Sequence, residues 1–320
     1  MPAFAAHYLL GKQVFQSVRK DPHLTRLEAQ PFLLGAQGPD PLLFHCLIPL
    51  YMPGRSARGV SSALHRAGPD RTIGAMADYL REHPGDMDAF SYACGFLTHY
   101  ALDSLAHPYI YYTQGAIKKR RHIPYIGFIV HNRIEANIDA GMINRVLGEA
   151  DARVFDTPSL LRAPQKMKME IGRMMSIVAA QVTGKKWPPA VYAEAFDDMR
   201  RVQQLLYDPA GKKRKWMYAL QIPFYWIAGP FATSLMRRST PEKMWDFLND
   251  SGSEWRYPAN PEHTSRDSFA ALYEQAEKLS EKLIPAFVRL IETGDREIYT
   301  LTGDRSFLTG LPVTKEREER

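Results

Sequence analysis

The feature that most constrains the fold is a run of ligand-type side chains at every fourth residue, His99, Asp103 and His107, inside an otherwise apolar stretch. In an α-helix each residue turns the chain by about 100°, so steps of four stay on one face. The spacing predicts a helix from about residue 86 or 87 to 107, with Pro108 ending or bending it. Two imidazoles and a carboxylate are costly to bury without a partner, and a divalent cation can pair with all three.

A second pair with the same spacing, His131 and Glu135, lies on a segment that is expected to be helical to about Leu147. Two helices that each offer an imidazole and a carboxylate can enclose a metal across a bundle core. A single His–acid pair is more often a local hydrogen bond, so the metal prediction depends on both sets together. Asp139, four residues beyond Glu135, is expected either to support the site from behind or to lie at the surface.

Three further candidate ligands lie earlier in the chain. His7 is on an apolar helix predicted from Phe4 to Arg19, and His65 is expected near the start of a helix. Asp40 lies between two prolines, which make a rigid turn; it could equally cap the next helix. His45 is in an apolar run, where a core or surface role is favoured over metal binding.

Composition and charge narrow the class of protein. The chain has 320 residues, 45% hydrophobic and 24% charged, as in an ordinary globular protein with one large core or two domains. The formal charge of +6 favours anionic partners such as phosphate esters, acidic membranes or nucleic acid. Cys46 and Cys94, both in apolar settings, indicate buried thiols and neither a disulfide framework nor a thiolate metal site. Because the N-terminal residues do not have the pattern of a signal peptide, we expect a cytoplasmic protein.

Basic and aromatic residues are interleaved in two places. Tyr109 to His122 could hold a phosphate-bearing substrate or could be a solvated connecting loop. Residues 212–238 combine basic flanks with the Trp/Tyr/Phe-rich run 216–231, which suits peripheral membrane contact or a buried helical hairpin. Further helices are predicted over 167–182, 190–207 and 267–293, and the region around Trp245 and Trp255 is expected to be loop-like.

Taken together, these motifs resemble the bacterial zinc-dependent phospholipase C family, whose fold and metal site are shared with the S1/P1-type nucleases. The resemblance covers roughly residues 1 to 150, and it is carried by His7, Gly38-Pro39-Asp40, Leu64-His65, His99-x3-Asp103-x3-His107 and His131-x3-Glu135.

The resemblance implies an all-α fold, a multi-helix phospholipase C/P1 nuclease-like bundle, with a three-zinc cluster at the bottom of a cleft. Carried over by position, one zinc would be held by Asp40, His65, His99 and Asp103. A second would be held by His107, His131 and Glu135, and His7 with Asp103 would contribute to a third.

The sequence departs from the family pattern in three places. Secreted members complete the third zinc site with an N-terminal Trp, which has no counterpart near the start of this chain, so two Zn²⁺ are expected. Choline-preferring members have aromatic residues where this chain has Pro41 and Ser62, so a preference for phosphatidylcholine is not implied. The step from Asp103 to His107 is also shorter than in the secreted enzymes.

We therefore predict a metal-binding catalytic helical domain over residues 1–155 and a helical extension over 156–320 that packs on it or covers it. The expected activity is zinc-dependent, phospholipase C-like hydrolysis of a phosphodiester, a phospholipid or an analogue, by a metal-activated water. Asp40 is expected to be both a ligand and the catalytic proton acceptor. The alternatives are a single-strand nuclease of the S1/P1 type and a non-enzymatic helical binding module.

Overall fold

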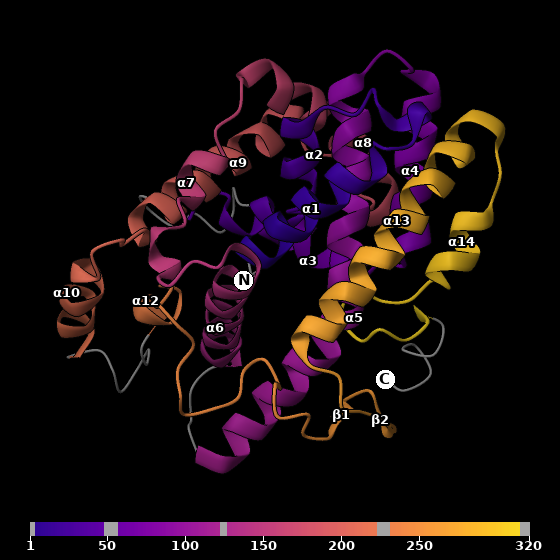
Figure 1. The fold of residues 1–320 in the computed structure, drawn as a ribbon. Helices are drawn as coiled ribbons and strands as arrows, with labels where there is room; N and C mark the ends of the chain where they lie inside the picture. The colour runs from indigo at the N-terminus through magenta and orange to yellow at the C-terminus, as the bar shows by residue number, and fades with distance from the viewer. Residues whose placement is uncertain (1–3, 48–56, 122–126, 223–230, 314–320) are drawn as a thin grey trace.

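The other elements are arranged around one long helix, α5, in the computed structural model, which describes residues 4–47, 57–121, 127–222 and 231–313 (Figure 1). Within these ranges the chain is all-α, as predicted, apart from one small antiparallel sheet. The elements are α1 (Phe4–Val18), η1 (Pro22–Leu24), α2 (Ala29–Gly35), η2 (Asp40–Phe44), α3 (Arg58–Arg66), α4 (Pro69–Glu82), α5 (Met87–Arg121), α6 (Gly127–Leu147), η4 (Ala152–Val154), α7 (Thr157–Leu160), α8 (Gln165–Thr183), α9 (Pro189–Leu206), α10 (Lys212–Gln221), α12 (Phe231–Ser234), β1 (Trp255–Tyr257), β2 (Asn260–Ser265), α13 (Phe269–Thr293) and α14 (Glu297–Thr302).

The helix α5 continues through Pro108 to Arg121, so of the two predicted effects of this proline, ending or bending the helix, the first is wrong. A proline in a helix interior removes one backbone hydrogen bond and costs about 3 kcal/mol, but tertiary packing on both sides of this position outweighs that cost. Tyr109 makes one such contact: its hydroxyl donates to the carbonyl oxygens of Asp246 (3.2 Å) and Phe247 (3.0 Å). The aromatic residues after Pro108 are helical, so the alternative of a solvated connecting loop is wrong as far as Arg121. His122 lies outside the described residues.

Close contact between α2 and α5 depends on two glycines. A Cβ on Gly35 would lie 2.1 Å from the carbonyl oxygen of Tyr92, and one on Gly95 would lie 1.9 Å from that of Phe32. Any larger residue at either position would push the helices apart. This packing holds the turn that follows α2, which contains Asp40, against the middle of α5.

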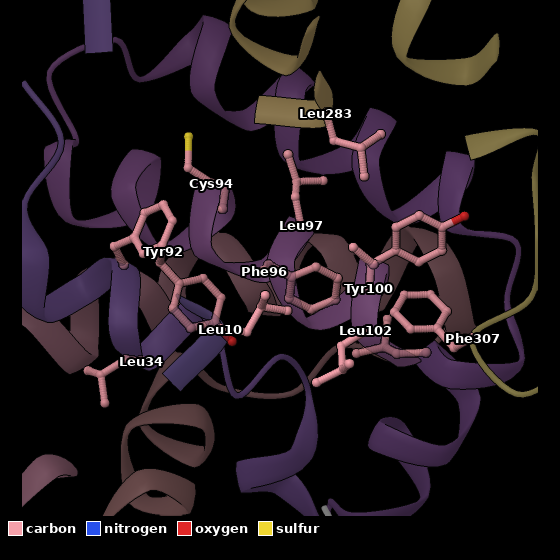
Figure 2. Packing of buried hydrophobic residues seen from close by; sticks show 14 of the residues in the cluster. Leu10, Leu34, Tyr92, Cys94, Phe96, Leu97, Tyr100, Leu102, Leu283 and Phe307 are labelled. Atoms are coloured by element: carbon pink, nitrogen blue, oxygen red, sulfur yellow. The ribbon is translucent and has the colours of Figure 1, made fainter. Parts of the chain in front are cut away.

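The second half of the chain packs on the same core as the first. Figure 1 shows α13 alongside α5, and in Figure 2 Leu283 of α13 points toward Leu97 of α5. The rings of Tyr100 and Phe307 meet edge to face, with centroids 5.0 Å apart. One cluster of buried apolar residues includes both Phe4 and Phe307. The predicted division at residue 155 stays a prediction, but residues on its two sides share a core.

Several sequence-based boundaries are confirmed and others need correction. The helices predicted over 4–19, 131–147, 167–182, 190–207 and 267–293 correspond to α1, α6, α8, α9 and α13. His65 lies near the end of α3, not near its start, and the loop expected around Trp255 contains the hairpin of β1 and β2. Cys94 is buried, whereas Cys46 is only partly buried.

The segment 212–238 is only partly described, because residues 223–230 lie outside the described ranges. None of the residues of α10 is buried, so the alternative of a buried hairpin is wrong for this part of the segment. Among the described helices, none combines the length and the hydropathy needed to cross a bilayer.

Candidate metal centre

The fold brings all eight predicted ligands to one region. His7 comes from α1, Asp40 from the first position of η2, and His65 from the last turn of α3. The others come from two neighbouring helices: His99, Asp103 and His107 from α5, and His131 and Glu135 from α6. Their ligand atoms form three overlapping or adjacent groups in which all atoms lie within 4.8 Å of one another: His7, His99 and Asp103; Asp40, His65 and His99; and His107, His131 and Glu135.

Asp103 belongs to the first group and also contacts His65 of the second, and the two groups share His99. Its Oδ2 lies 3.1 Å from Nε2 of His99 and 3.4 Å from Nε2 of His65, and these two nitrogens are 3.3 Å apart. Nε2 of His65 is also 3.4 Å from Oδ1 of Asp40. The three side chains that the resemblance assigns to one zinc together with Asp40 therefore converge on a common point.

His7 contacts the other carboxylate oxygen of Asp103. Its Nε2 lies 3.2 Å from Oδ1 of Asp103, and its ring stacks on that of His99 with centroids 4.4 Å apart. Asp103 can thus offer Oδ1 on the side of His7 and Oδ2 on the side of His65 and His99, as a shared ligand between two positions would.

The third group lies one helical turn further along α5. Nε2 of His131 is 3.0 Å from Oε1 of Glu135, and the rings of His131 and His107 stack with centroids 5.9 Å apart. The His131 side chain is 12% exposed and the Glu135 side chain 5% exposed. This group is therefore close to the surface of the cavity and still largely enclosed.

Three of the imidazoles are oriented from behind by oxygen acceptors. Nδ1–H of His65 can donate to the carbonyl oxygen of Ser61 at 2.9 Å, and Nδ1–H of His107 to that of Phe307 at 2.8 Å. Nδ1 of His131 is 3.1 Å from the side-chain oxygen of Gln114. A histidine that donates from one ring nitrogen keeps the lone pair of the other for a metal, and metal-binding histidines generally have such a partner.

Hydrogen bonding alone does not satisfy the cluster. The two Nε2 atoms of His65 and His99 face each other at 3.3 Å, so both cannot carry a proton there. Oδ2 of Asp103 is buried and, among the described residues, has no hydrogen-bond partner of acceptable geometry, although three imidazoles surround it. A divalent cation would satisfy these lone pairs together, so the residues fit a metal.

The electrostatics of the metal-free cluster agree with this fit. Burial favours a higher pKa for Asp103, but the surrounding histidines, led by His107 and His99, hold the pKa well below its usual range. Burial also favours a higher pKa for Glu135, but nearby positive groups, chiefly the imidazole of His131, lower this pKa to about 2. Both carboxylates are therefore charged in the folded chain, as metal ligands must be.

The histidines respond in opposite directions. Burial lowers the pKa of His65, but the carboxylates of Asp103 and Asp40 outweigh it and raise the pKa to about 9. The pKa of His7 is raised in the same way, whereas burial lowers the pKa of His107. The carboxylates of Asp103 and Asp40 thus favour a positive charge at His65. A metal cation could supply that charge in place of the imidazole proton.

A close backbone contact fixes the position of His99. Gly38 has a φ of +53°, and a Cβ built on it would lie 2.2 Å from Cδ2 of the His99 ring. The turn that presents Asp40 therefore lies directly against this imidazole, and only glycine combines the left-handed conformation with the space available.

Six of the eight candidate ligands, all except His7 and His99, line a cavity of about 240 Å³. Arg66 lines it and is the one residue in its lining that adds a positive charge beyond the histidines; Tyr111 and Ser62 also line it. The ring of Tyr111 lies 5.3 Å from that of His131. The cavity is bordered by Asp40, Leu43, Ser62, His65, Arg66, Asp103, His107, Tyr111, His131, Glu135 and Leu308.

The acceptors behind the histidines were not predicted from the sequence. Ser61 is four residues before His65, which is a local helical signal, but Gln114 and Phe307 are brought in by tertiary contacts. Asp139 is buried and is not a ligand: its two oxygens accept from the backbone N–H groups of Ala5 (3.0 Å) and Ala6 (2.9 Å). It therefore holds the start of α1, the helix that carries His7.

A fourth group of ligand-type atoms, His45, Cys46 and Asp198, lies outside this centre. Nδ1 of His45 accepts from the backbone N–H of Ala57 at 3.1 Å, so the neutral ring carries its proton on Nε2, the nitrogen nearest Cys46 and Glu194. The group is therefore less suited to a metal than the three around Asp103 and Glu135.

Comparison of the chain with protein-family models, with curated proteins and with solved structures gave no match. The class of the chain is therefore defined by its own geometry: an all-α protein with buried His/Asp/Glu groups that could hold metal ions.

Proposed function

We propose that this protein is a zinc-dependent phosphodiester hydrolase of the phospholipase C type. The observation that carries the proposal is the convergence of Asp40, His65, His99 and Asp103 beside a second group, His107, His131 and Glu135. All of these residues except His99 line one cavity. Mixed imidazole and carboxylate ligands suit zinc, whereas Mg²⁺ and Ca²⁺ prefer sites made of oxygen atoms.

An open cavity favours catalysis over a purely structural metal. Structural zinc sites are usually closed by four protein ligands, whereas catalytic sites leave a position open. Here six of the eight candidate ligands line the cavity, together with Tyr111 and Ser62, so the site is not enclosed by ligands alone. This arrangement argues against the non-enzymatic binding module.

Zinc bound in such a site lowers the pKa of a bound water to about 7 and neutralises phosphoryl oxygens. The chain's own residues would do the rest. Asp40, fixed by its flanking prolines and 3% exposed, would accept the proton of the attacking water. Arg66 would bind a phosphoryl oxygen from the rim, a charge-assisted contact that orients the phosphorus.

The size of the cavity supports a substrate that enters only in part. Pockets that enclose a drug-sized ligand usually have about 300–1,000 Å³, more than the 240 Å³ found here. The phosphodiester and its nearest groups would fit inside, and a long acyl chain or a polynucleotide would remain outside. The competing reading, a single-strand nuclease, would use Tyr111 as a stacking surface for a base.

The proposal is tested by comparing substrates on the zinc-loaded protein. We expect hydrolysis of a chromogenic phosphodiester and of dispersed phospholipid, with little release of nucleotides from single-stranded DNA. Asp103→Asn should lower the rate by about 100-fold or more, whereas His23→Ala, a change outside the centre, should leave it unchanged. Faster cleavage of DNA than of phospholipid would support the nuclease, and equal rates for the wild type and Asp103→Asn would end the proposal.

A further inference from the structure

An ordinary surface helix turns its apolar side chains toward the protein, whereas α10 turns two polar side chains toward it. The guanidinium of Arg214 faces the protein and donates to the carbonyl oxygens of Thr233 (3.2 Å) and Met236 (3.0 Å). Gln221, seven residues later and so on the same face, donates to the hydroxyl of Thr233 at 2.7 Å. Two polar residues thus attach the helix to the body of the molecule.

Trp216 and Leu220 lie on the opposite face of the helix from Arg214 and Gln221, and so point away from the body. Trp216 is 73% exposed and Leu220, one turn later, 68%, while Tyr218 and Ile222 are each 53% exposed. Figure 1 shows α10 at the left edge of the molecule, beyond α12. In a soluble protein the apolar stripe of a surface helix faces the core. A helix that turns this stripe outward is suited to an apolar or interfacial environment on its outer side.

The charge around this stripe is positive. Lys212, Lys213 and Lys215 are exposed on α10, and the helix contains no acidic residue. Beside it lies a hollow of about 450 Å³ bordered by basic and aromatic side chains, with Arg214 and Lys215 of the helix itself. The lining consists of Arg153, Gly211, Arg214, Lys215, Tyr218, Arg238 and Ser239. The surface therefore combines exposed apolar groups with a site for anionic groups.

We propose that α10 is a membrane-binding helix that lies in the headgroup region of an anionic phospholipid bilayer. Trp216 and Leu220 enter the boundary between headgroups and acyl chains, where tryptophan is favoured. The lysines extend to the phosphates, as long basic side chains do at interfaces. The basic hollow receives a lipid headgroup.

Two other occupants fit the surface less well. Single-stranded nucleic acid is bound by basic grooves with aromatic stacking platforms, but Leu220 and Ile222 offer no ring on which a base could stack. A second copy packed face to face would bring the lysines of one α10 against those of the other, because a two-fold contact repeats the same patch on both sides.

The test is co-sedimentation of the full-length, zinc-loaded protein with vesicles of phosphatidylcholine alone and of an equal mixture of phosphatidylcholine and phosphatidylglycerol. We expect binding to the mixed vesicles that weakens with salt, and much weaker binding to phosphatidylcholine alone. Leu220→Ala and Trp216→Ala should each lower the partition coefficient about tenfold, and Lys215→Gln about fivefold. Leu147→Ala, which shortens an exposed leucine on α6, is the matched control and should bind like the wild type.

Membrane binding is separable from catalysis in these variants. Each α10 variant should hydrolyse a soluble chromogenic phosphodiester at the wild-type rate, because none of its changes touches the metal centre. The proposal would be overturned by wild-type vesicle binding in Trp216→Ala and Leu220→Ala. It would also be overturned if these variants lost binding of a single-stranded oligonucleotide, or changed from dimer to monomer, with vesicle binding unaltered.

Discussion

His107 and Phe307 are separated by 200 positions and joined by a hydrogen bond, in which Nδ1–H of the imidazole donates to the backbone carbonyl oxygen at 2.8 Å. The ring of Phe307 also lies against the rings of His65 and His99, with centroid distances of 5.6 and 6.3 Å. The C-terminal part of the chain thus orients one candidate ligand and packs on two others. Both halves of the molecule therefore contribute to the candidate metal centre.

The acceptor behind His131 should contribute to metal affinity. Gln114→Leu removes the oxygen that lies 3.1 Å from Nδ1 of His131, and we expect the zinc affinity to fall about 10- to 100-fold. Gln114→Glu keeps an acceptor at this position and should retain or raise the affinity. Competition with a chromogenic chelator measures both. Equal affinities for the Leu variant and the wild type would mean that this contact does not orient the ligand.

The contact between Gly38 and His99 should be intolerant of a methyl group. Gly38→Ala places a Cβ within 2.2 Å of the ring and a side chain at positive φ, so we expect a loss of about 2 kcal/mol or more in the free energy of unfolding, together with weaker zinc binding. The matched control is Gly59→Ala on α3, where a Cβ meets nothing within 4 Å. That change should be neutral or stabilise the helix by about 0.5–1 kcal/mol. Guanidinium unfolding distinguishes the two.

The carboxylate of Asp139 should stabilise the start of α1. It accepts two backbone N–H groups and lies 3.5 Å from the buried guanidinium of Arg237, so Asp139→Asn leaves that charge without its partner. We expect a loss of about 3 kcal/mol. Asp250→Asn breaks an exposed pair with Arg145 of α6 and should cost less than about 1 kcal/mol. A similar small loss in both variants would show that Asp139 does not anchor the helix.

How much of this centre could be read from the sequence depends on how local each signal is. The faces of α5 and α6 were predictable because His99, Asp103, His107, His131 and Glu135 follow the helical repeat. The assignment of Asp40 as a ligand depended on the family resemblance, because the sequence Gly-Pro-Asp does not indicate which helix the turn packs against.

Other features had no local signal at all. The passage of α5 through Pro108 is decided by packing from residues more than a hundred positions away, and so is the contact of Phe307 with His107. The role of Asp139 also depends on a tertiary contact. Its spacing from Glu135 suggested a place behind the ligands, whereas it accepts hydrogen bonds from backbone N–H groups near the N-terminus. Tertiary contacts of this kind leave no periodic pattern.

Stability of the metal-free protein should fall with rising pH above 6.5. The pKa of His65 is raised to about 9, so the folded chain holds a proton that the unfolded chain releases above its ordinary pKa of 6.5. The resulting stabilisation is complete below pH 6.5 and is lost as the pH rises through about 9; His7 changes in the same direction. We expect a loss on the order of 3 kcal/mol over this interval.

Zinc should remove this pH dependence, because a ligating imidazole is already unprotonated. Thermal unfolding of the protein in a chelator and with zinc, at several pH values between 6.5 and 9, measures both curves. Parallel curves in the two conditions would argue that His65 does not bind the metal.

The central claim is that the buried imidazoles and carboxylates bind metal, and elemental analysis of the protein purified without chelators and supplemented with zinc tests it most directly. The account predicts at least two zinc ions per chain, one in the group around His65, His99 and Asp103 and one in the group of His107, His131 and Glu135. The variants His65→Ala and His131→Ala should each lose part of this zinc, whereas His23→Ala should keep it all. A wild-type zinc content near zero after supplementation would contradict the account.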